Sequence, residues 1–134
     1  MNDCLFCKIV SKEIPYEKIY EDENFLAFLD INPVNQGHTL VIPKKHSRTI
    51  FEMDDKNVKE IMMIVKKVAN KIRKTLKADG INIMINNESA AGQIIFHTHI
   101  HIIPRFSGDG LKHWPGQEYK NGEAQSIVKK ITAI

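Results

Sequence analysis

Cysteine is scarce in this 134-residue sequence, which has two, at positions 4 and 7. Small secreted domains held together by disulfides need more cysteines than this, so that class of protein is excluded. In a reducing compartment, the spacing Cys4-x-x-Cys7 indicates metal or redox chemistry rather than a structural disulfide.

Long apolar runs are also missing. No stretch approaches the roughly 18–20 apolar residues that a membrane-spanning helix needs. The N-terminal residues Met1-Asn2-Asp3-Cys4 contain no basic segment followed by an apolar one, so we expect no secretory signal peptide. These two absences predict a cytoplasmic protein that does not contact a membrane.

A strong excess of one charge is missing too. The net charge is +3, from 19 Lys and Arg against 16 Asp and Glu. This balance suits a small anionic substrate but is too weak for a dedicated nucleic-acid-binding surface, so we expect no nucleic-acid partner. With 43% apolar and 26% charged residues, and no repeat or linker, the chain is predicted to form a single globular domain over residues 1–134.

The pattern of apolar residues predicts five strands and three helices. The expected strands cover residues 18–21, 25–29, 39–42, 81–86 and 94–103, and Pro104 is expected to end the last one. Short helices are expected over 4–11 and from 123 onward. A long helix over 55–78, ended by Asp79-Gly80, has an apolar stripe and many basic residues, which indicate a solvated face rather than a phosphate-binding one. This order favours an α+β fold with an antiparallel sheet.

Three histidines alternate with other residues near the end of the expected last strand. On a strand, His97, His99 and His101 project from one face, each about 7 Å from the next. The outer two are then about 13 Å apart, too far to bind one metal ion, so the three must divide their roles. The alternative is a chance cluster on a histidine-rich solvent face. A neutral imidazole is also a good phosphorus nucleophile near pH 7, since its ordinary pKa is about 6.5.

The cysteine pair leaves two alternatives open on residues alone. A redox pair of the thioredoxin type follows a strand and opens a helix, and no strand precedes Cys4. A zinc site requires two further ligands.

Several motifs together resemble the histidine triad family. The segment His97-x-His99-x-His101 is similar to the signature that names this family. The surrounding motifs agree in type and order: Ala27-Phe28-Leu29-Asp30-Ile31-Asn32-Pro33, Gly37-His38-x-Leu40-Val41-Ile42-Pro43-Lys44-x-His46, and Gly92-Gln93. The resemblance extends from Cys4 to about Arg105 and is to the nucleoside phosphoramidase branch with a bacterial-type Cys-x-x-Cys.

The resemblance implies both a fold and an activity. The fold is HIT-like α+β, a five-stranded antiparallel sheet with one long helix and short terminal helices, in a chain that forms a homodimer. The activity is hydrolysis or transfer at the α-phosphorus of AMP-type purine nucleotides through a covalent nucleotidyl-histidine, as in a nucleoside phosphoramidase. The alternatives are a dinucleoside polyphosphate hydrolase with the same nucleophile and a zinc-stabilised nucleotide-binding regulatory module with residual activity.

The resemblance also assigns roles to the histidines and to Asp30. It makes His99 the nucleophile, with one ring nitrogen held by a backbone carbonyl. It makes His101 the residue that contacts the phosphate and assists the leaving group, and it places His38 behind the site. Asp30 matches the carboxylate that binds both ribose hydroxyls. On residues alone, Asp30 is a loop carboxylate that caps Asn32 or a nearby amide.

The remaining site residues come from the same resemblance. An apolar purine slot is formed by Phe6, Ile9, Phe28 and Ile31, which on residues alone are core positions. Groups near the phosphate are Asn86, Gly92 and Gln93. Ile94 stands where this branch usually has Ser or Thr, which removes a hydroxyl donor, and Trp114 lies in a segment similar to the branch's C-terminus. The implied structural zinc ligands are Cys4, Cys7, His46 and His97.

Overall fold

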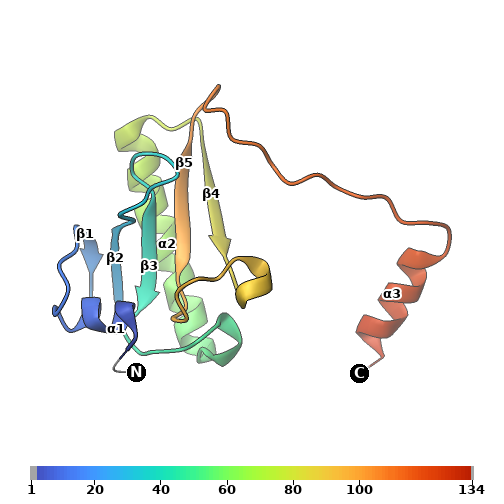
Figure 1. Cartoon of the computed structure of the whole chain (residues 1–134), viewed down its shortest axis with the longest axis horizontal. Helices are drawn as coiled ribbons and strands as arrows, with labels where there is room; N and C mark the ends of the chain where they lie inside the picture. Colours follow the sequence, from blue (N-terminus) through green and yellow to red (C-terminus); the bar gives the residue numbers. More distant parts are fainter. Residues whose placement is uncertain (1–2, 134) are drawn as a thin grey trace.

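The computed structural model describes residues 3–133. Its five strands are the five expected, and all neighbours are antiparallel in the order β1-β2-β3-β5-β4. The elements in chain order are α1 (Leu5–Val10), β1 (Lys18–Glu21), β2 (Phe25–Leu29), β3 (Thr39–Pro43), a 3-10 turn (Ile50–Glu52), α2 (Asp55–Leu76), β4 (Gly80–Ile85), a second 3-10 turn (Ser89–Ala91), β5 (Ile100–Arg105) and α3 (Glu123–Thr132). Figure 1 shows α2 lying across one face of this sheet.

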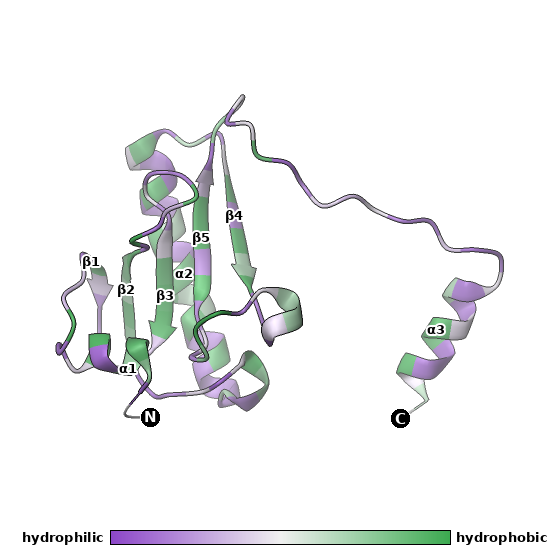
Figure 2. Cartoon of the chain, viewed as in Figure 1, coloured by the Kyte–Doolittle hydropathy of each residue, from purple (hydrophilic) through white to green (hydrophobic). Residues whose placement is uncertain are grey.

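Helix α2 covers one face of the sheet because its apolar side chains recur every three or four residues. Ile61, Val65 and Val68 are buried in this stripe. They pack against side chains that alternate on the facing strands, among them Val41 and Ile100. The central strands β2 and β3 are apolar except for Thr39 at the start of β3 (Figure 2), since both of their faces are covered.

The opposite face of the sheet carries a second apolar cluster. Leu26, Phe28 and Leu40 point to this side, and α1 covers them with Phe6 and Ile9. Cys4 caps the start of α1, and its sulfur accepts a hydrogen bond from the backbone N–H of Cys7 at 3.4 Å. The N-terminal segment is therefore positioned over the face of the sheet away from α2.

The prediction that the last strand begins at residue 94 is wrong, since β5 begins at Ile100. The segment before it forms a loop rather than a strand. The backbone N–H of Thr98 donates to the Ser47 carbonyl at 2.7 Å and holds this loop in place. Pro104 also lies inside β5 rather than ending it. Strand β3 pairs with β5 only over residues 100–102, so Pro104 has a strand neighbour on one side only and its missing N–H is tolerated.

The long helix ends earlier than predicted. It stops at Leu76, where Lys77 adopts a left-handed conformation with φ of 55°. The N–H groups of Lys77 and Ala78 both donate to the Arg73 carbonyl, which completes the last turn. Gly80 therefore begins β4 rather than ending the helix.

The C-terminal part of the chain extends away from the sheet. An extended segment follows β5 and carries α3 to a position beside the rest of the molecule (Figure 1). No helix in the described part of the chain is long and apolar enough to cross a membrane.

Candidate functional site

Three histidines meet on the α1 side of the sheet. His38 directly precedes β3, His99 directly precedes β5, and His101 lies within β5. The rings of His99 and His101 are 4.9 Å apart between centroids, and those of His38 and His101 are 5.2 Å apart. Phe6 of α1 packs edge-on against His99 at 5.1 Å. The predicted same-face alignment of three histidines on one strand is wrong, because His97 and His99 lie in the preceding loop.

The proton of the His99 ring is located by a backbone carbonyl. Nδ1 of His99 lies 2.7 Å from the carbonyl oxygen of His97, so Nδ1 carries the proton and donates it. Nε2 of the neutral ring therefore has a free lone pair. The side chain is 6% exposed, and this burial lowers the pKa of His99. The backbone contact that was predicted for this ring is present.

A chain of hydrogen bonds fixes the protons of His38 and His101. The backbone N–H of Val34 donates to Nδ1 of His38 at 3.1 Å, so the proton of the neutral His38 ring is on Nε2. That Nε2–H faces Nδ1 of His101 at 2.9 Å. His101 must then carry its own proton on Nε2. Burial, with His99 and His38 nearby, lowers the pKa of His101 to about 4, which keeps this ring neutral.

Nε2 of His101 is the last nitrogen in this series of hydrogen bonds. Among residues 3–133 it is the buried side-chain nitrogen that has no hydrogen-bond partner. A buried donor without a partner is costly unless a ligand supplies the acceptor. The site thus pairs a lone pair on His99 with an N–H on His101.

Asp30 caps a turn in the loop after β2 and also lies near His38. Its Oδ1 accepts the backbone N–H of Asn32 at 2.8 Å, the capping role that its position alone suggests. Its Oδ2 lies 3.7 Å from Nε2 of His38. Asp30, His38 and His101 are close enough to hold a metal, but Nε2 of His38 carries a proton, so this set is a poor metal site.

The four predicted purine-slot residues do not lie together. Phe6, Ile9 and Phe28 are buried in the cluster under α1. Ile31 is 88% exposed, in the loop between β2 and β3, and is not part of that cluster. It follows Asp30, and the turn that Asp30 caps directs the chain outward.

The loop between β4 and β5 carries the residues predicted to lie near the phosphate. Gly92 has φ of +97°, and a Cβ atom there would lie 3.6 Å from the Asn86 amide, so both lie together at the surface of the loop. The Gln93 side chain instead forms hydrogen bonds with backbone groups. Its amide donates to the carbonyls of Arg48 and Ile95 and accepts the Glu88 N–H.

Gln93 therefore holds the loop in shape, and both of its donors are occupied within the chain. Ile94 is 83% exposed and supplies no side-chain donor at the position where the resemblance would place a hydroxyl. Trp114 lies in the extended C-terminal segment and is exposed.

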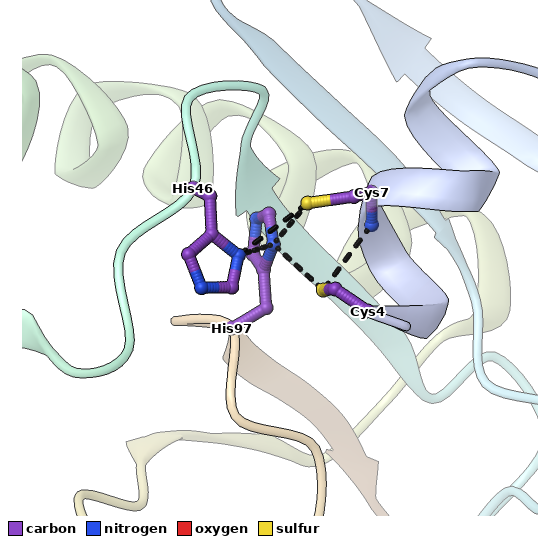
Figure 3. Close-up of side chains that lie close together, drawn as sticks. All are labelled: Cys4, Cys7, His46 and His97. Atoms are coloured by element: carbon purple, nitrogen blue, oxygen red, sulfur yellow. Dashed lines mark hydrogen bonds between the residues drawn. The ribbon is translucent and has the colours of Figure 1, made fainter. Parts of the chain in front are cut away.

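The two cysteines and two histidines predicted to bind metal converge on one point (Figure 3). Their ligand atoms all lie within 4.8 Å of one another. His46 Nδ1 is 3.4 Å from Cys7 Sγ and 3.1 Å from His97 Nδ1. Cys4 Sγ is 3.4 Å from His97 Nδ1. Tetrahedral zinc, with bonds of about 2.0–2.3 Å, places neighbouring ligand atoms about 3.3–3.8 Å apart. The two sulfur–nitrogen distances fall in this range, and the two histidine nitrogens lie slightly closer together.

The protonation of this cluster also suits a cation. Nε2 of His97 lies 2.8 Å from the Pro43 carbonyl and donates to it, which leaves the Nδ1 lone pair facing the sulfurs. Burial and the contact with Cys4 raise the pKa of the Cys7 thiol to about 11. Two thiolates at this distance need a positive ion, and two sulfurs with two imidazoles are a complete zinc set.

Two backbone groups in the site were not predicted. The Val34 N–H sets the tautomer of His38, and the Pro43 carbonyl sets that of His97. Neither depends on a particular side chain, so no residue type in the sequence signals it.

Comparison with known proteins identifies the family. Residues 11–108 match the HIT domain. The crystal structure of a HIT family protein from Bacillus subtilis is 43% identical, with a TM-score of 0.91 over 98% of this chain and 96% of that chain. A zinc-bound histidine triad family protein from Mycobacterium smegmatis is 40% identical, with a TM-score of 0.79 over 98% of this chain and 94% of that one.

A third relative has a named activity. The adenylylsulfatase HINT3 from Arabidopsis thaliana is 48% identical over 110 residues, which are 82% of this chain. The match covers 56% of that protein, so this chain spans just over half of its length. With the histidines, the sheet order and these matches in agreement, the chain belongs to the HIT family.

Proposed function

We propose that this chain is a nucleotide hydrolase that acts at the α-phosphorus of AMP-type purine substrates, with a phosphoramidate as the preferred substrate. One observation carries the proposal: the His99 ring, which has a free lone pair on Nε2, lies 4.9 Å between centroids from the ring of His101, which has a buried, unpartnered N–H. A phosphate group placed between them would meet a nucleophile and a hydrogen-bond donor together. Members of the HIT family are in general nucleotide hydrolases, which supports this assignment.

In the first step, Nε2 of His99 attacks the α-phosphorus and the bond from phosphorus to the leaving amine breaks. The proton already sits on Nδ1, so the lone pair needs no prior deprotonation. The carbonyl of His97, which accepts that proton's hydrogen bond, stabilises the positive charge that develops on the ring. The product is a nucleotide joined to His99.

The leaving amine departs with the bonding electron pair and takes a proton from water. His101 is neutral, and a neutral imidazole N–H donates a hydrogen bond rather than releasing its proton. Its part is therefore to stabilise charge on the phosphate oxygens or on the leaving atom. In the second step water attacks phosphorus, the bond to His99 breaks with its electron pair returning to Nε2, and AMP is released. The proton that the attacking water loses neutralises the hydroxide left when the amine was protonated.

Asp30 is assigned to the ribose. A carboxylate that accepts two hydroxyl groups makes short, strong hydrogen bonds and selects ribose over deoxyribose. Asp30 is partly exposed and lies at the edge of the histidine cluster. The purine then rests against the apolar cluster under α1, which contains Phe6, Ile9 and Phe28.

The Cys4, Cys7, His46 and His97 cluster is assigned a structural zinc. When bound, the ion supplies a fixed tetrahedral crosslink, and four protein ligands leave no open position for a reactive water. The cluster joins α1, with Phe6 of the base slot, to the loop that carries His99. The zinc-bound relative from Mycobacterium smegmatis supports this assignment.

A homodimer through the β4 edge is the second part of this proposal. β4 is an outer strand of the sheet and has a strand neighbour on one side only. Apolar side chains are exposed along it and along the adjoining helix: Met62, Met63, Ile83 and Met84. A second copy that pairs with this edge would cover both features. If the chain sediments as a stable monomer at micromolar concentration, the proposed dimer is wrong.

The test of function compares AMP release from three substrates: adenosine phosphoramidate, a diadenosine polyphosphate and adenylyl sulfate. The proposal expects the phosphoramidate to have the highest kcat/KM. A preference for the diadenosine compound would favour the alternative hydrolase. Adenylyl sulfate belongs in the set because the Arabidopsis relative is named an adenylylsulfatase. Binding of AMP without turnover of any of the three would favour a zinc-stabilised regulatory module.

A further inference from the structure

Cys4 and Cys7 are a pair of thiols as well as a pair of candidate metal ligands. They are the two cysteines of the chain, and both side chains are partly exposed. Their sulfurs lie within 4.8 Å of each other, and Figure 3 shows both pointing from the start of α1 toward His46 and His97. Disulfide oxidoreductases use the same Cys-x-x-Cys spacing for a reversible disulfide. The two sulfurs are therefore placed to bond to each other.

A hollow in the surface gives access to one of the two sulfurs. It has a volume of about 450 Å³, and its lining residues are Asp3, Cys4, Leu5, His46, Arg48 and residues 94–96. A water molecule occupies about 30 Å³ in the liquid, so a small oxidant such as hydrogen peroxide fits in this space. Cys7 does not line the hollow. An oxidant that enters it therefore meets Cys4 first.

Side chains rather than backbone bonds attach α1 to the rest of the chain. The helix has 6 residues, and its backbone hydrogen bonds run within residues 4–14. Helices this short are unstable in isolation and depend on packing. Phe6 and Ile9 pack into the apolar cluster on the sheet, and the cysteines face the two loop histidines. Without a crosslink at the cysteines, Phe6 and Ile9 are the main attachment of α1.

Phe6 connects α1 to the nucleotide site. Its ring packs edge-on against His99 at 5.1 Å and against Phe28 at 5.5 Å between centroids. His97 of the cysteine cluster lies 5.9 Å from the same ring. A change at the cysteines that loosens α1 therefore affects both the base slot and the surroundings of the nucleophile.

We propose that peroxide converts Cys4 and Cys7 to a reversible disulfide, which releases the metal and weakens nucleotide binding by loosening α1. The inference rests on the structural zinc and the base slot proposed above. It goes beyond them, since neither requires the cysteines to react. The pair acts within its own chain, so it does not need the strand that precedes the redox pair of thioredoxin-type enzymes.

The reaction moves two electrons from the two thiolates to the peroxide. The Cys4 thiolate attacks one peroxide oxygen, an S–O bond forms, the O–O bond breaks, and hydroxide leaves. The Cys7 thiolate then attacks the sulfur of Cys4, the S–S bond forms, the S–O bond breaks, and a second hydroxide leaves. Each hydroxide takes a proton from the solvent and becomes water. The remaining His46 and His97 are only half of a structural zinc set, so the metal is released.

The first test treats the zinc-loaded full chain with hydrogen peroxide. Mass spectrometry should find the peptide with Cys4 and Cys7 lighter by two hydrogen atoms and resistant to alkylation. A chromogenic chelator should detect zinc in an amount equal to the disulfide. Hydrogen exchange in residues 5–10 should become faster, and the dissociation constant of AMP should rise at least about fivefold, the lower end for coupling between two sites.

Reversal separates the disulfide from other oxidation. Dithiothreitol with added zinc should restore the hydrogen exchange of α1 and the affinity for AMP. Methionine sulfoxide requires its own reductases, so damage at methionine would persist after this treatment. Losses that dithiothreitol and zinc fail to reverse would overturn the proposal.

A matched pair of variants tests the order of the two steps. Cys7→Ser and Cys4→Ser each remove one sulfur ligand and leave one thiol. Dimedone, which traps sulfenic acids, is added together with peroxide. Cys7→Ser should be labelled on Cys4, and Cys4→Ser should be labelled on Cys7 several-fold more slowly, because oxidation follows exposure of the sulfur. Equal or faster labelling of Cys7 would overturn the assignment of Cys4 as the attacking residue.

Three further results would contradict the proposal. Met63 is 72% exposed and serves as an internal reference, so intact thiols in samples where Met63 is oxidised would overturn it. A disulfide that forms without loss of zinc would do the same, as would release of zinc with unchanged hydrogen exchange in α1 and unchanged AMP affinity. If the untreated chain does not bind AMP, the proposed function is wrong, whereas the disulfide, the zinc and the exchange of α1 still decide the redox inference.

Discussion

Nε2 of His38 lies 2.9 Å from Nδ1 of His101, and this contact determines which nitrogen of His101 faces the site with a proton. Val34 supplies the preceding link through its backbone N–H. The proposed phosphate-binding donor of His101 therefore depends on a residue that does not itself touch the phosphate. His38 is a positioning residue in this account.

Replacing His101 and His38 singly and together tests this dependence. His101→Ala should lower kcat/KM about 10- to 100-fold, the range for losing a hydrogen bond to a charged group. His38→Ala should cost less, because His101 remains but its tautomer is no longer fixed. The double variant should be close to His101→Ala alone, since both changes remove one interaction. Effects that multiply would mean that His38 acts independently.

Asp30 can be tested with ribose and deoxyribose substrates. Asp30→Ala should weaken ribonucleotide binding by about 1.5–3 kcal/mol, the scale of a charged hydrogen bond. Asp30→Asn keeps an oxygen for the Asn32 N–H and serves as the control for the loop. Binding is measured by calorimetry with AMP and with deoxy-AMP. An equal loss for both nucleotides would show that Asp30 does not bind the ribose.

Removing the metal should affect stability more than chemistry. Structural zinc sites contribute on the order of 10 kcal/mol in apparent binding energy at neutral pH. Chelation or Cys4→Ser should therefore lower the melting temperature and raise KM, because α1 carries Phe6 of the base slot. Folded protein should still form the covalent nucleotide on His99. If stability were unchanged while that intermediate disappeared, the metal would have a catalytic role.

The free energy of unfolding should decrease as the pH is lowered, because the folded chain holds His101 neutral. Burial lowers the pKa of His101 to about 4, below the ordinary value near 6.5. The unfolded chain then binds a proton between these values that the folded chain does not, so unfolding becomes easier as pH falls from about 6.5 toward 4. Asp30, His38 and His99 surround this ring and act on its charge.

The measurement compares wild-type protein with His101→Asn in urea unfolding between pH 7.5 and about 4.5, a window that brackets the histidine pKa. Both proteins keep the zinc ligands, so the difference between them isolates residue 101. The variant should lose less stability across this range. Parallel curves would contradict the assignment of a neutral, buried His101.

Much of the fold follows from local patterns in the sequence. The stripe of Ile61, Val65 and Val68 predicts α2, and the apolar runs in β2 and β3 predict buried strands. The start of β5 does not follow. The alternation from residue 94 looks like a strand, but bonds between Thr98 and Ser47, which are distant in sequence, hold that segment as a loop.

The site divides in the same way. The motifs and the family resemblance predicted which histidines belong to the site. The structure shows that His97 lies with the two cysteines and that His101 contacts His38. The backbone contact of His99 followed from the resemblance, but the proton positions of His38 and His97 could not be predicted, because backbone groups with no side-chain signature set them. The role of Gln93 also depends on the tertiary structure, because its amide donates to carbonyls that only the folded loop brings near.

The most direct measurement is a single turnover with adenosine phosphoramidate, quenched during the reaction, with the attached nucleotide located by mass spectrometry. The account predicts an adenylyl group on His99. It also predicts that His99→Ala binds AMP, carries no such group and turns over at least about 10³-fold more slowly. An adenylyl group on another residue, or near-normal AMP release by His99→Ala, would contradict it.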